Sequence, residues 1–371
     1  MKRVIGFAAA IFAVAMALTA VAQGEVKMSI WGHTADGTPV PIYTLRSGQI
    51  EVRVMAYGAK LVSVKTPDRS GKMADVVLGY DSLENYLNDS QTHFGSIVGR
   101  YGNRIALGKF TLDGKTYQIP INNGPNALHG GTMGFDRHVW QSKEVPNGAE
   151  FTLVSPDGDM GFPGTLTAHV KYTVQGNTLR IDYSATTDKD TVLNITNHAY
   201  FNLNGDDKGT ILNQKIQIDA ERYTPTDAGL IPTGELAPVA GTPLDFRKPE
   251  VIGARINDDN AQLKLAGGYD FNFVLDGKMG TMHPAATVAD PESGRKMTVE
   301  TTEPGVQFYS GNFLDGTFTG RHGVKYVRNT GFCLETQHFP DSPNHPNFPS
   351  TVVHPGQTFH STTTFTFSVE K

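Results

Sequence analysis

The stretch TLTAHVKYTVQGNTLRIDYSATT (165–187) decides the fold of this 371-residue chain. Two β-rich runs flank the turn residues Gln175-Gly176-Asn177, and this arrangement is typical of a β-hairpin. The segment KFTLDGKTYQI (109–119) repeats the arrangement around Asp113-Gly114. Similar β-rich runs recur between turns at residues 49–66, 150–156 and 358–369. The chain is therefore predicted to consist mainly of antiparallel strands.

Helical patterns are scarce, and nothing in the sequence divides the chain into parts. DSLENYLN (81–88) predicts a short helix capped by Asp81 or Ser82, and PEVIGARI (249–256) predicts another. There is no βαβ rhythm, no internal repeat and no Pro-rich or Ser-rich linker. We expect an all-β fold with few short helices, a large antiparallel β-sandwich formed by a single domain over residues 25–371. Long loops on one open sheet face would then build a site.

The first 22 residues have the pattern of a signal peptide. Two basic residues at positions 2–3 precede an apolar stretch to about residue 18, and AVA (20–22) matches a small-x-small cleavage site. The apolar stretch is shorter than the roughly 20 residues that a membrane-spanning helix needs. We expect cleavage before Gln23 and export to a bacterial periplasm, with secretion to the outside left open. An uncleaved membrane anchor is the competing interpretation.

Charge and cysteine content exclude several classes of function. Removal of residues 1–22 takes the formal net charge from −5 to −7, because Lys2 and Arg3 are lost. No basic run follows, so nucleic acid and anionic membrane are poor partners. Cys333 is the single cysteine, which excludes an internal disulfide. We expect it to be a small buried side chain, with a reactive thiol as the alternative. We also expect a monomer, because no apolar patch pattern is evident.

The segment NITNHAYFNLNG (194–205) carries the first candidate catalytic group, His198. It follows TVLNI (191–195), which is typical of a buried strand, and precedes the aromatic residues Tyr200 and Phe201. Polar side chains and flat aromatic faces around a histidine suit a sugar ligand. The imidazole, with an unperturbed pKa of about 6.5, can exchange a proton near neutral pH. A structural histidine without function is the alternative.

Two glycine-rich segments supply further polar groups. GSIVGRYGNRIALGKF (95–110) contains Asn103 next to Arg104, whose permanently charged guanidinium can bind sugar hydroxyls. NNGPNALHGGTMGFDRHVW (122–140) contains His129 before two glycines, and offers Phe135 and Trp140 as stacking faces. A surface ion-pair partner and a turn histidine without function are the respective alternatives for Arg104 and His129.

Two carboxylates stand among apolar residues. Asp270 lies between Tyr269 and Phe271, and a carboxylate there needs hydrogen bonds, either from two sugar hydroxyls or from backbone amides. Glu335 follows the apolar run FCL (332–334). Desolvation would raise the pKa of Glu335 toward neutral pH, which suits a general base. A structural glutamate paired with an arginine is the alternative.

No motif for a metal ion or a nucleotide cofactor is present. The chain has 12 histidines but no HxxxH or HxH pair, and His338, His345 and His354 are widely spaced in a proline-broken segment. No GxSxG elbow, P-loop or dinucleotide fingerprint occurs. We therefore expect neither a bound metal ion nor a cofactor.

A series of motifs resembles the aldose 1-epimerase (galactose mutarotase) family. In chain order they are GRYGNRI, LHGG, TNHAYFNL, LIPTGE…GTPLDF, GGYDFNF, PGVQFYSGNF and LETQHFPDSPN. The resemblance covers nearly the whole mature chain, and a set this long and ordered is highly specific. It implies the family's fold, a galactose mutarotase-like supersandwich with the sugar bound on an open sheet face.

The resemblance also implies an activity and a set of site residues. The activity is the interconversion of α and β anomers of free aldohexoses such as glucose and galactose, with Glu335 as general base and His198 as general acid. His129 would support the ring-oxygen side. The residues implied to bind the monosaccharide are Asn103, Arg104, His129, Asp270 and Gln307. Two positions depart from the family pattern: Gly102 stands where alanine is common, and Phe271 where histidine is common. The second change is expected to alter the wall of the site.

The implied mechanism needs only acid and base groups. Glu335 takes the proton of the anomeric hydroxyl while His198 protonates the ring oxygen, so the ring opens, C1 rotates and the ring closes again. No cofactor is needed, because no redox or group transfer occurs. Two alternatives remain at this point. One is a non-catalytic periplasmic sugar-binding protein, and the other is a glycoside hydrolase or lyase that uses Asp270 and Glu335 as paired carboxylates.

Overall fold

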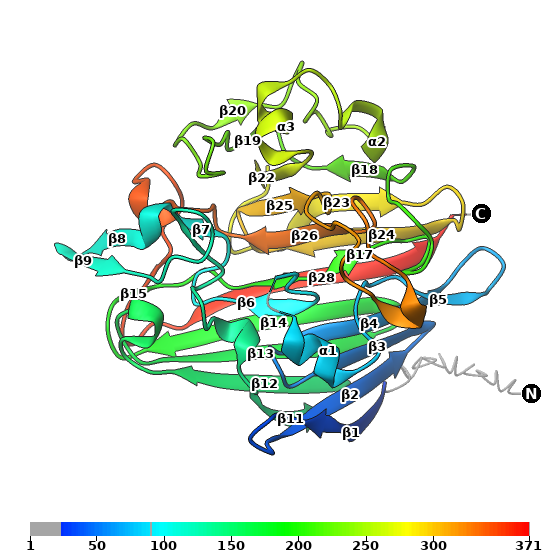
Figure 1. The fold of residues 1–371 in the computed structure, drawn as a ribbon, viewed down its shortest axis with the longest axis horizontal. Coiled ribbons are helices and arrows are strands. Elements are labelled where there is room, and N and C mark those ends of the chain that lie inside the picture. The colour runs from blue at the N-terminus through cyan, green and yellow to red at the C-terminus, as the bar shows by residue number, and fades with distance from the viewer. Residues whose placement is uncertain (1–23, 90, 371) are drawn as a thin grey trace, which may run out of the picture.

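The computed structural model describes residues 24–89 and 91–370, and antiparallel sheets dominate it (Figure 1). The largest sheet has nine strands, in the order β11 (Gln141–Val145), β12 (Gly148–Ser155), β13 (Leu166–Gln175), β14 (Thr178–Thr187), β28 (Phe359–Val369), β24 (Arg295–Thr301), β23 (His283–Ala289), β18 (Lys215–Ile218) and β21 (Glu250–Val251). A second sheet has six, in the order β17 (Tyr200–Phe201), β26 (Phe332–Gln337), β25 (Gly305–Tyr309), β22 (Asp270–Val274), β19 (Arg222–Tyr223) and β20 (Ala237–Pro238). A third has five consecutive strands, β1 (Glu25–His33), β2 (Pro39–Ser47), β3 (Ile50–Met55), β4 (Lys60–Pro67) and β5 (Met73–Asp75).

Short strand pairs and helices complete the described part of the chain. The pairs are β16 (Thr196–His198) with β6 (Ser96–Val98), β10 (Ala127–Leu128) with β7 (Arg104–Ile105), β8 (Lys109–Leu112) with β9 (Lys115–Gln118), and β15 (Thr191–Val192) with β27 (Val352–Val353). The α-helices are α1 (Leu83–Asn88), α2 (Ile252–Arg255) and α3 (Ala261–Ala266). Single 3₁₀ turns occur at Ala106–Gly108, Phe135–Arg137, Asp159–Gly161, Arg321–Gly323 and Ser342–Asn344. The expected all-β class with few short helices is confirmed.

One hydrophobic cluster joins the three large sheets. Its members include Val52 of β3, Tyr172 of β13, Phe308 of β25 and Phe367 of β28, all of which are at most 2% exposed. Along β13 buried and half-buried residues alternate strictly, which is the period of a strand with one face toward a core. The sheets therefore pack face to face as a sandwich. We retain the single domain over residues 25–371 as a prediction.

The hairpins predicted from turn residues are confirmed. In the β13–β14 hairpin Gln175 pairs with Thr178, so Gly176 and Asn177 form a two-residue turn, and Gly176 has a φ of +57°. The DG turn between β8 and β9 has positive φ angles at both central residues, which a type I′ turn requires. Both signals are local in the sequence, so they can be recognised without knowledge of the tertiary fold.

The helix predictions are partly confirmed. Helix α1 lies where DSLENYLN predicts it, and the Ser82 side chain caps it by accepting a hydrogen bond from the Asn85 amide at 3.3 Å. In PEVIGARI only α2 is helical, because the preceding Glu250–Val251 pairs with β18 as strand β21. Helix α3 was not predicted, although Asn260 caps its start and Gly267, with φ +66°, ends it.

The run TVLNI (191–195) differs from the continuous buried strand that the sequence indicates. Only Thr191–Val192 forms a strand there, and β16 begins at Thr196. Between them the backbone changes partners, because the Leu193 amide donates to Thr351 and the Asn194 amide to Arg100. This change of partners turns the chain toward β6 and places His198 on the short β16–β6 pair.

The predicted signal peptide (1–22) lies outside the described residues. Within the described ranges, no helix is long and apolar enough to cross a membrane.

Candidate active site

A cleft of about 500 Å³ opens beside the six-stranded sheet. Six of the seven predicted site residues line it, and they come from distant parts of the chain: Asn103, Arg104, His129, His198, Asp270 and Glu335. The seventh, Gln307, does not line the cleft. Each of the seven is at most 7% exposed, so the cleft has a buried polar floor.

Strands β22, β25 and β26 form this floor with one face only. Asp270 pairs with Tyr309 in the strand register, and Gln307 pairs with Glu335 on the next strand. Side chains two residues apart on a strand point to the same face, so these four share the polar face. The intervening residues on the other face enter the hydrophobic core, among them Phe271, Phe308 and Leu334.

The expectation that Phe271 alters the wall of the site is wrong. Phe271 is fully buried on the core face, where its ring packs edge-on against Tyr223 at 6.0 Å between centroids. It is absent from the cleft lining. Because neighbouring residues on a strand point to opposite faces, Asp270 cannot line the cleft together with Phe271.

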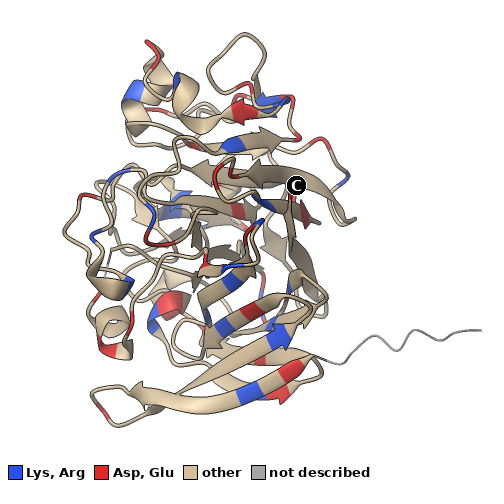
Figure 2. Ribbon diagram, turned by 90° about the vertical axis from the view of Figure 1, so that its right-hand side faces the viewer, with Lys and Arg blue, Asp and Glu red and all other residues tan. Residues whose placement is uncertain are grey.

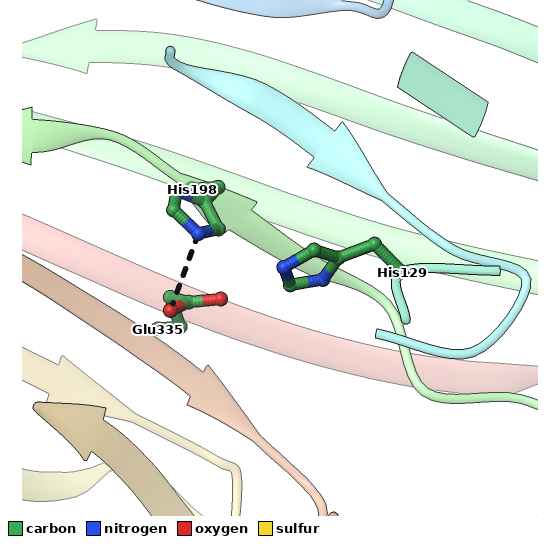
Figure 3. Close-up of side chains that lie close together, drawn as sticks. All are labelled: His129, His198 and Glu335. Atoms are coloured by element: carbon green, nitrogen blue, oxygen red, sulfur yellow. Dashed lines mark ion pairs between the residues drawn. The ribbon is translucent and has the colours of Figure 1, made fainter. Parts of the chain in front are cut away.

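Glu335 and His198 face each other across the cleft floor. Glu335 Oε1 lies 3.7 Å from His198 Nε2, and the other carboxylate oxygen, Oε2, has no hydrogen-bond partner among the described residues. Figure 3 shows His198 on its short green strand and Glu335 on β26, with the dashed ion pair between them. The gap is wider than a hydrogen bond, and Glu335 keeps one carboxylate oxygen without a partner among the described residues. The pair is thus open to an incoming ligand.

Burial shifts the pKa values of this pair in opposite directions. Desolvation raises the pKa of Glu335 well above its usual range, the negative charge of Asp270 adds to the rise, and Arg104 partly opposes it. Desolvation lowers the pKa of His198 to about 3, and the neighbouring His93 lowers it further. Burial in the cleft therefore favours a neutral carboxyl group and a neutral imidazole. The expected rise in the pKa of Glu335 is present.

His129 completes a group of three proton-active side chains. The backbone amide of Asn103 donates to His129 Nδ1 at 3.2 Å, which leaves Nε2 of His129 to face the other two groups (Figure 3). Asn103 and His129 both have positive φ angles, +64° and +52°, a conformation that non-glycine residues adopt mainly in constrained sites. Burial, followed by the nearby His93, lowers the pKa of His129 well below 6.5.

Arg104 and Asp270 form a further polar part of the cleft lining. Arg104 Nη1 lies 3.7 Å from Asp270 Oδ2, and Arg104 Nε donates to Asn123 Oδ1 at 3.1 Å. Burial raises the pKa of Asp270, while Arg104 and Gln307 oppose that rise. Gln307 Nε2 donates to Asp270 Oδ1 at 2.7 Å. Gln307 therefore supports Asp270 from behind, whereas the sequence led us to expect direct contact with a sugar.

The stacking faces predicted at Phe135 and Trp140 are also wrong. Both side chains are at most 2% exposed and pack edge-on against each other, with centroids 5.7 Å apart. Trp140 Nε1 donates to the Phe135 carbonyl at 2.9 Å, so its polar end is satisfied within the core. The aromatic rings that do line the cleft are Tyr200, Tyr309, Phe313 and Phe318.

Comparison with known proteins places this site in a family. The sequence model described as aldose 1-epimerase matches residues 41–366. The chain belongs to the aldose 1-epimerase family.

Individual relatives agree with this family assignment over nearly the whole chain. Galactose mutarotase of Bos taurus is 46% identical over 346 residues, which cover 93% of this chain and 99% of the bovine protein. Aldose 1-epimerase of Escherichia coli K12 is 41% identical over 340 residues, covering 90% and 97% of the two chains. The crystal structure of galactose 1-epimerase from Lactobacillus acidophilus superposes with a TM-score of 0.83 at 29% identity, over 94% and 99% of the two chains. The expected mutarotase-like fold is confirmed.

The aldose 1-epimerase cleft also brings together potential metal ligands. One ligand atom each from His129, His198 and Glu335 lies within 4.8 Å of the others. The three histidines considered from the sequence, His338, His345 and His354, do not join them, because each is paired with its own carboxylate elsewhere. We therefore interpret the group as a set of proton-active side chains. A metal ion would bind there only if the three ligand atoms moved closer together.

Sequence reasoning missed several residues of this aldose 1-epimerase cleft. His93, Asn123 and Tyr309 all line it, yet only the motifs around the last two were noted. Tyr309 could have been found, since it lies two residues from Gln307 and strand alternation places both on one face. His93 gives no local signal, because its approach to His198 depends on the pairing of Ser96 with His198 between β6 and β16.

Proposed function

We propose that this member of the aldose 1-epimerase family is a mutarotase that interconverts the α and β anomers of free aldohexoses such as glucose and galactose. The single observation that carries the proposal is the 3.7 Å approach of Glu335 Oε1 to His198 Nε2 in a buried cleft of monosaccharide size. One acid and one base, close enough together to reach the anomeric hydroxyl and the ring oxygen of one sugar, are what reversible opening of a pyranose ring requires.

In the proposed reaction Glu335 and His198 each transfer one proton when the ring opens and one when it closes. Glu335 accepts the proton of the anomeric hydroxyl as His198 donates a proton to the ring oxygen, and the bond between C1 and O5 breaks. Rotation about the C1–C2 bond presents the other face of the aldehyde, and the same two groups then reverse their roles to close the ring. His129, beside His198, supports the ring oxygen.

The electrostatics of the cleft assist the opening step. Ring opening leaves Glu335 protonated and His198 neutral, and these are the forms that burial favours for both groups. Burial disfavours the charged forms that are needed before opening, so the hydroxyl groups of the sugar must stabilise them. Each positioned acid or base is worth about 10²–10⁴-fold in rate.

The two other functions considered have less support. A glycoside hydrolase needs Asp270 free as a second catalytic carboxylate, but Arg104 and Gln307 already hold it as a binding group. A sugar-binding protein needs Arg104 and Asp270, yet it gains nothing from the desolvated pair of Glu335 and His198. We assign Arg104 and Asp270 to the sugar hydroxyls, with Asn103 as a further contact and Gln307 as the support of Asp270.

We further propose that the protein is exported, to a bacterial periplasm or beyond, and acts there as a monomer on free monosaccharides. The signal-peptide pattern of residues 1–22 supports export. Figure 2 shows basic and acidic residues interspersed along the ribbon, which is unfavourable for nucleic acid or an anionic membrane as partner. Sedimentation of the mature protein and fractionation of cells that express the full chain test the two statements.

The test of the proposed activity is the rate of anomer exchange. Freshly dissolved α-D-glucose and α-D-galactose, followed by polarimetry and by NMR of the anomeric protons, should equilibrate faster in proportion to enzyme concentration. A panel of free hexoses and pentoses then defines the preferred sugar. Unchanged exchange with demonstrable sugar binding would favour the sugar-binding alternative, and release of reducing sugar from an oligosaccharide would favour the hydrolase.

A further inference from the structure

A third histidine, His93, lines the cleft beside the two that the mechanism uses. Its ring centroid lies 4.8 Å from that of His129 and 5.8 Å from that of His198. Its side chain is 14% exposed. The proposed mechanism assigns it no role.

Asp136 fixes the orientation of the His93 ring. His93 Nδ1 lies 3.1 Å from Asp136 Oδ2, and Arg137 Nε lies 3.2 Å from the same oxygen. Burial raises the pKa of Asp136, but its hydrogen bond with His93 and the charges around it, including buried Lys60, outweigh this effect and keep the pKa low. Asp136 is therefore an ionised acceptor and His93 Nδ1 a donor. Nε2 of His93 has no hydrogen-bond partner among the described residues.

The backbone around His93 is held as firmly as its ring. Gly95 donates its amide to the His198 carbonyl at 3.0 Å, and Ser96 donates to the His93 carbonyl at 3.0 Å. His93 itself has a φ of +55°, in the left-handed region that costs energy for a non-glycine residue. A Cβ at Gly95 would lie 1.9 Å from the Leu61 carbonyl oxygen. Backbone hydrogen bonds therefore join the loop to β4 and β16, and His93 lies in the cleft lining.

We propose that His93 is a specificity-determining residue that hydrogen-bonds the 6-hydroxyl of an aldohexose through Nε2. The assignment rests on the proposed function and extends it to the class of sugar. A hydroxyl group can donate to this nitrogen when the imidazole is neutral, and accept from it when the imidazole is charged. The contact would select hexoses over pentoses and over 6-deoxyhexoses.

The choice of the 6-hydroxyl follows from the groups already assigned. Glu335 acts on the oxygen of C1, and His198 and His129 act at the ring oxygen. Arg104 and Asp270 hold hydroxyls on the carbon ring. The ring oxygen has two neighbours, C1 and C5, and only C5 carries a hydroxymethyl group. Because His93 packs against both histidines of the ring-oxygen side, the group that it meets is this hydroxymethyl.

Two substitutions separate the sugar contact from the contact with Asp136. His93→Asn keeps an amide nitrogen near the position of Nδ1 and removes Nε2, and asparagine tolerates a left-handed backbone. His93→Gln keeps a polar atom near the position of Nε2 and gives up the bond to Asp136. The first variant therefore tests the sugar contact with the loop anchor preserved, and the second is its matched control.

The sugars form an equally matched series. D-Fucose is D-galactose without the 6-oxygen, and L-arabinose is the same ring without C6. D-Glucose, 6-deoxy-D-glucose and D-xylose form the corresponding series. For the unmodified enzyme we expect kcat/KM to fall from hexose to 6-deoxyhexose. In H93N this ratio should shrink by about twofold to tenfold, the range of one net hydrogen bond, through a higher KM for the hexose. H93Q should retain part of the ratio, and H93N should lose more activity with galactose than with fucose.

The outcomes separate this proposal from the proposed function. If the unmodified enzyme accelerates anomer exchange but H93N lowers the hexose and 6-deoxyhexose rates equally, His93 does not contact the 6-hydroxyl. If no sugar is converted faster, the mutarotase function fails, and the ratio of galactose to fucose dissociation constants from calorimetry replaces the kinetic ratio. A ratio that shrinks in H93N still supports the His93 contact, and an unchanged ratio overturns it.

Discussion

Two buried histidine–glutamate pairs meet at β26, and they differ in almost every property except burial. Glu335 lies within β26 and approaches His198 to 3.7 Å, while His338, three residues later, contacts Glu303 at 2.7 Å. All four side chains are at most 10% exposed. Among the described residues Glu335 Oε2 has no hydrogen-bond partner, whereas Glu303 and His338 form a direct hydrogen bond.

The pKa shifts of the two histidines show what the extra distance does. Burial lowers the pKa of His338 too, but the charge and hydrogen bond of Glu303 reverse the effect, so its pKa is raised. At His198 burial and the neighbouring His93 outweigh the opposing effect of Asp136, and the pKa falls to about 3. A short contact stabilises charge inside the protein, and a long one leaves a polar pair unsatisfied. We interpret the pair of Glu303 and His338 as structural and call it the closed pair. The pair of Glu335 and His198, which we call the open pair, is available to substrate.

The largest expected effect comes from removing the carboxylate of the open pair. Glu335→Gln should lower kcat by about 10²–10⁴-fold, because the amide cannot accept the proton of the anomeric hydroxyl. Polarimetry with α-D-galactose measures the loss. The matched control is Glu303→Gln in the closed pair, which should leave kcat unchanged. Equal rates for E335Q and the unmodified enzyme would show that Glu335 is not the base.

The free energy of unfolding should change more in E303Q than in E335Q, the opposite of the order expected for kcat. Glu303→Gln should lower the free energy of unfolding by about 1.5–3 kcal/mol, the contribution of a hydrogen bond between charged groups. Glu335→Gln should leave it unchanged or raise it, since it removes a desolvated carboxyl group that lacks a partner. Urea denaturation of the two variants checks both values. A larger loss in E335Q than in E303Q would reverse our interpretation of the pairs.

The sequence predicts which side chains share a strand face, but it does not predict the contact distances within the two pairs. Strand alternation and turn residues are local, so the hairpins and the face that carries Asp270 and Glu335 follow from them. The same alternation places Phe271 in the core, next to Asp270 but on the opposite face. We could have drawn this conclusion from the sequence, although we expected Phe271 to alter the wall of the site. The contact distances do not follow, because they depend on pairing between strands far apart in the chain. Glu303 and His93 were missed for this reason, and Phe135 was assigned to the wrong environment.

The pH dependence of stability should distinguish the pairs with a smaller signal. His338 has a raised pKa, so its contribution is fully present below the unfolded value of 6.5 and is lost as pH rises through the folded pKa. The stability advantage of the unmodified protein over E303Q should therefore shrink above pH 6.5.

At the open pair the trend concerns Glu335, whose folded pKa is raised above the unfolded value of 4.5. Above pH 4.5 the unfolded chain ionises this group while the folded protein still holds its proton, so stability is lost as pH rises. The difference in free energy of unfolding between E335Q and the unmodified protein should therefore grow in favour of E335Q as the pH rises above 4.5. Denaturation curves recorded in steps between pH 4 and pH 9 measure both differences, and parallel curves for all three proteins would contradict the assignment.

The smallest expected effect is that of metal ions on the open pair. Zinc bonds of about 2.0–2.1 Å place tetrahedral ligand atoms about 3.3 Å apart, whereas those of His129, His198 and Glu335 are spread over as much as 4.8 Å. The three side chains must close around the ion, so Zn²⁺ should bind weakly and compete with the sugar. Chelation with EDTA should leave the rate of anomer exchange unchanged.

Calorimetric titration with Zn²⁺ provides the control for this last comparison. His129→Asn should weaken binding by removing one of three ligands, while His354→Asn, in the half-exposed pair with Asp190, should affect only binding at the surface. The closed pair offers two groups that already satisfy each other, so E303Q should not alter zinc binding. Loss of activity in EDTA with recovery on added Zn²⁺ would instead make the ion a resident cofactor. The distance between Glu335 and His198 would then mark an empty metal site, and the acid–base account of the cleft would have to be replaced.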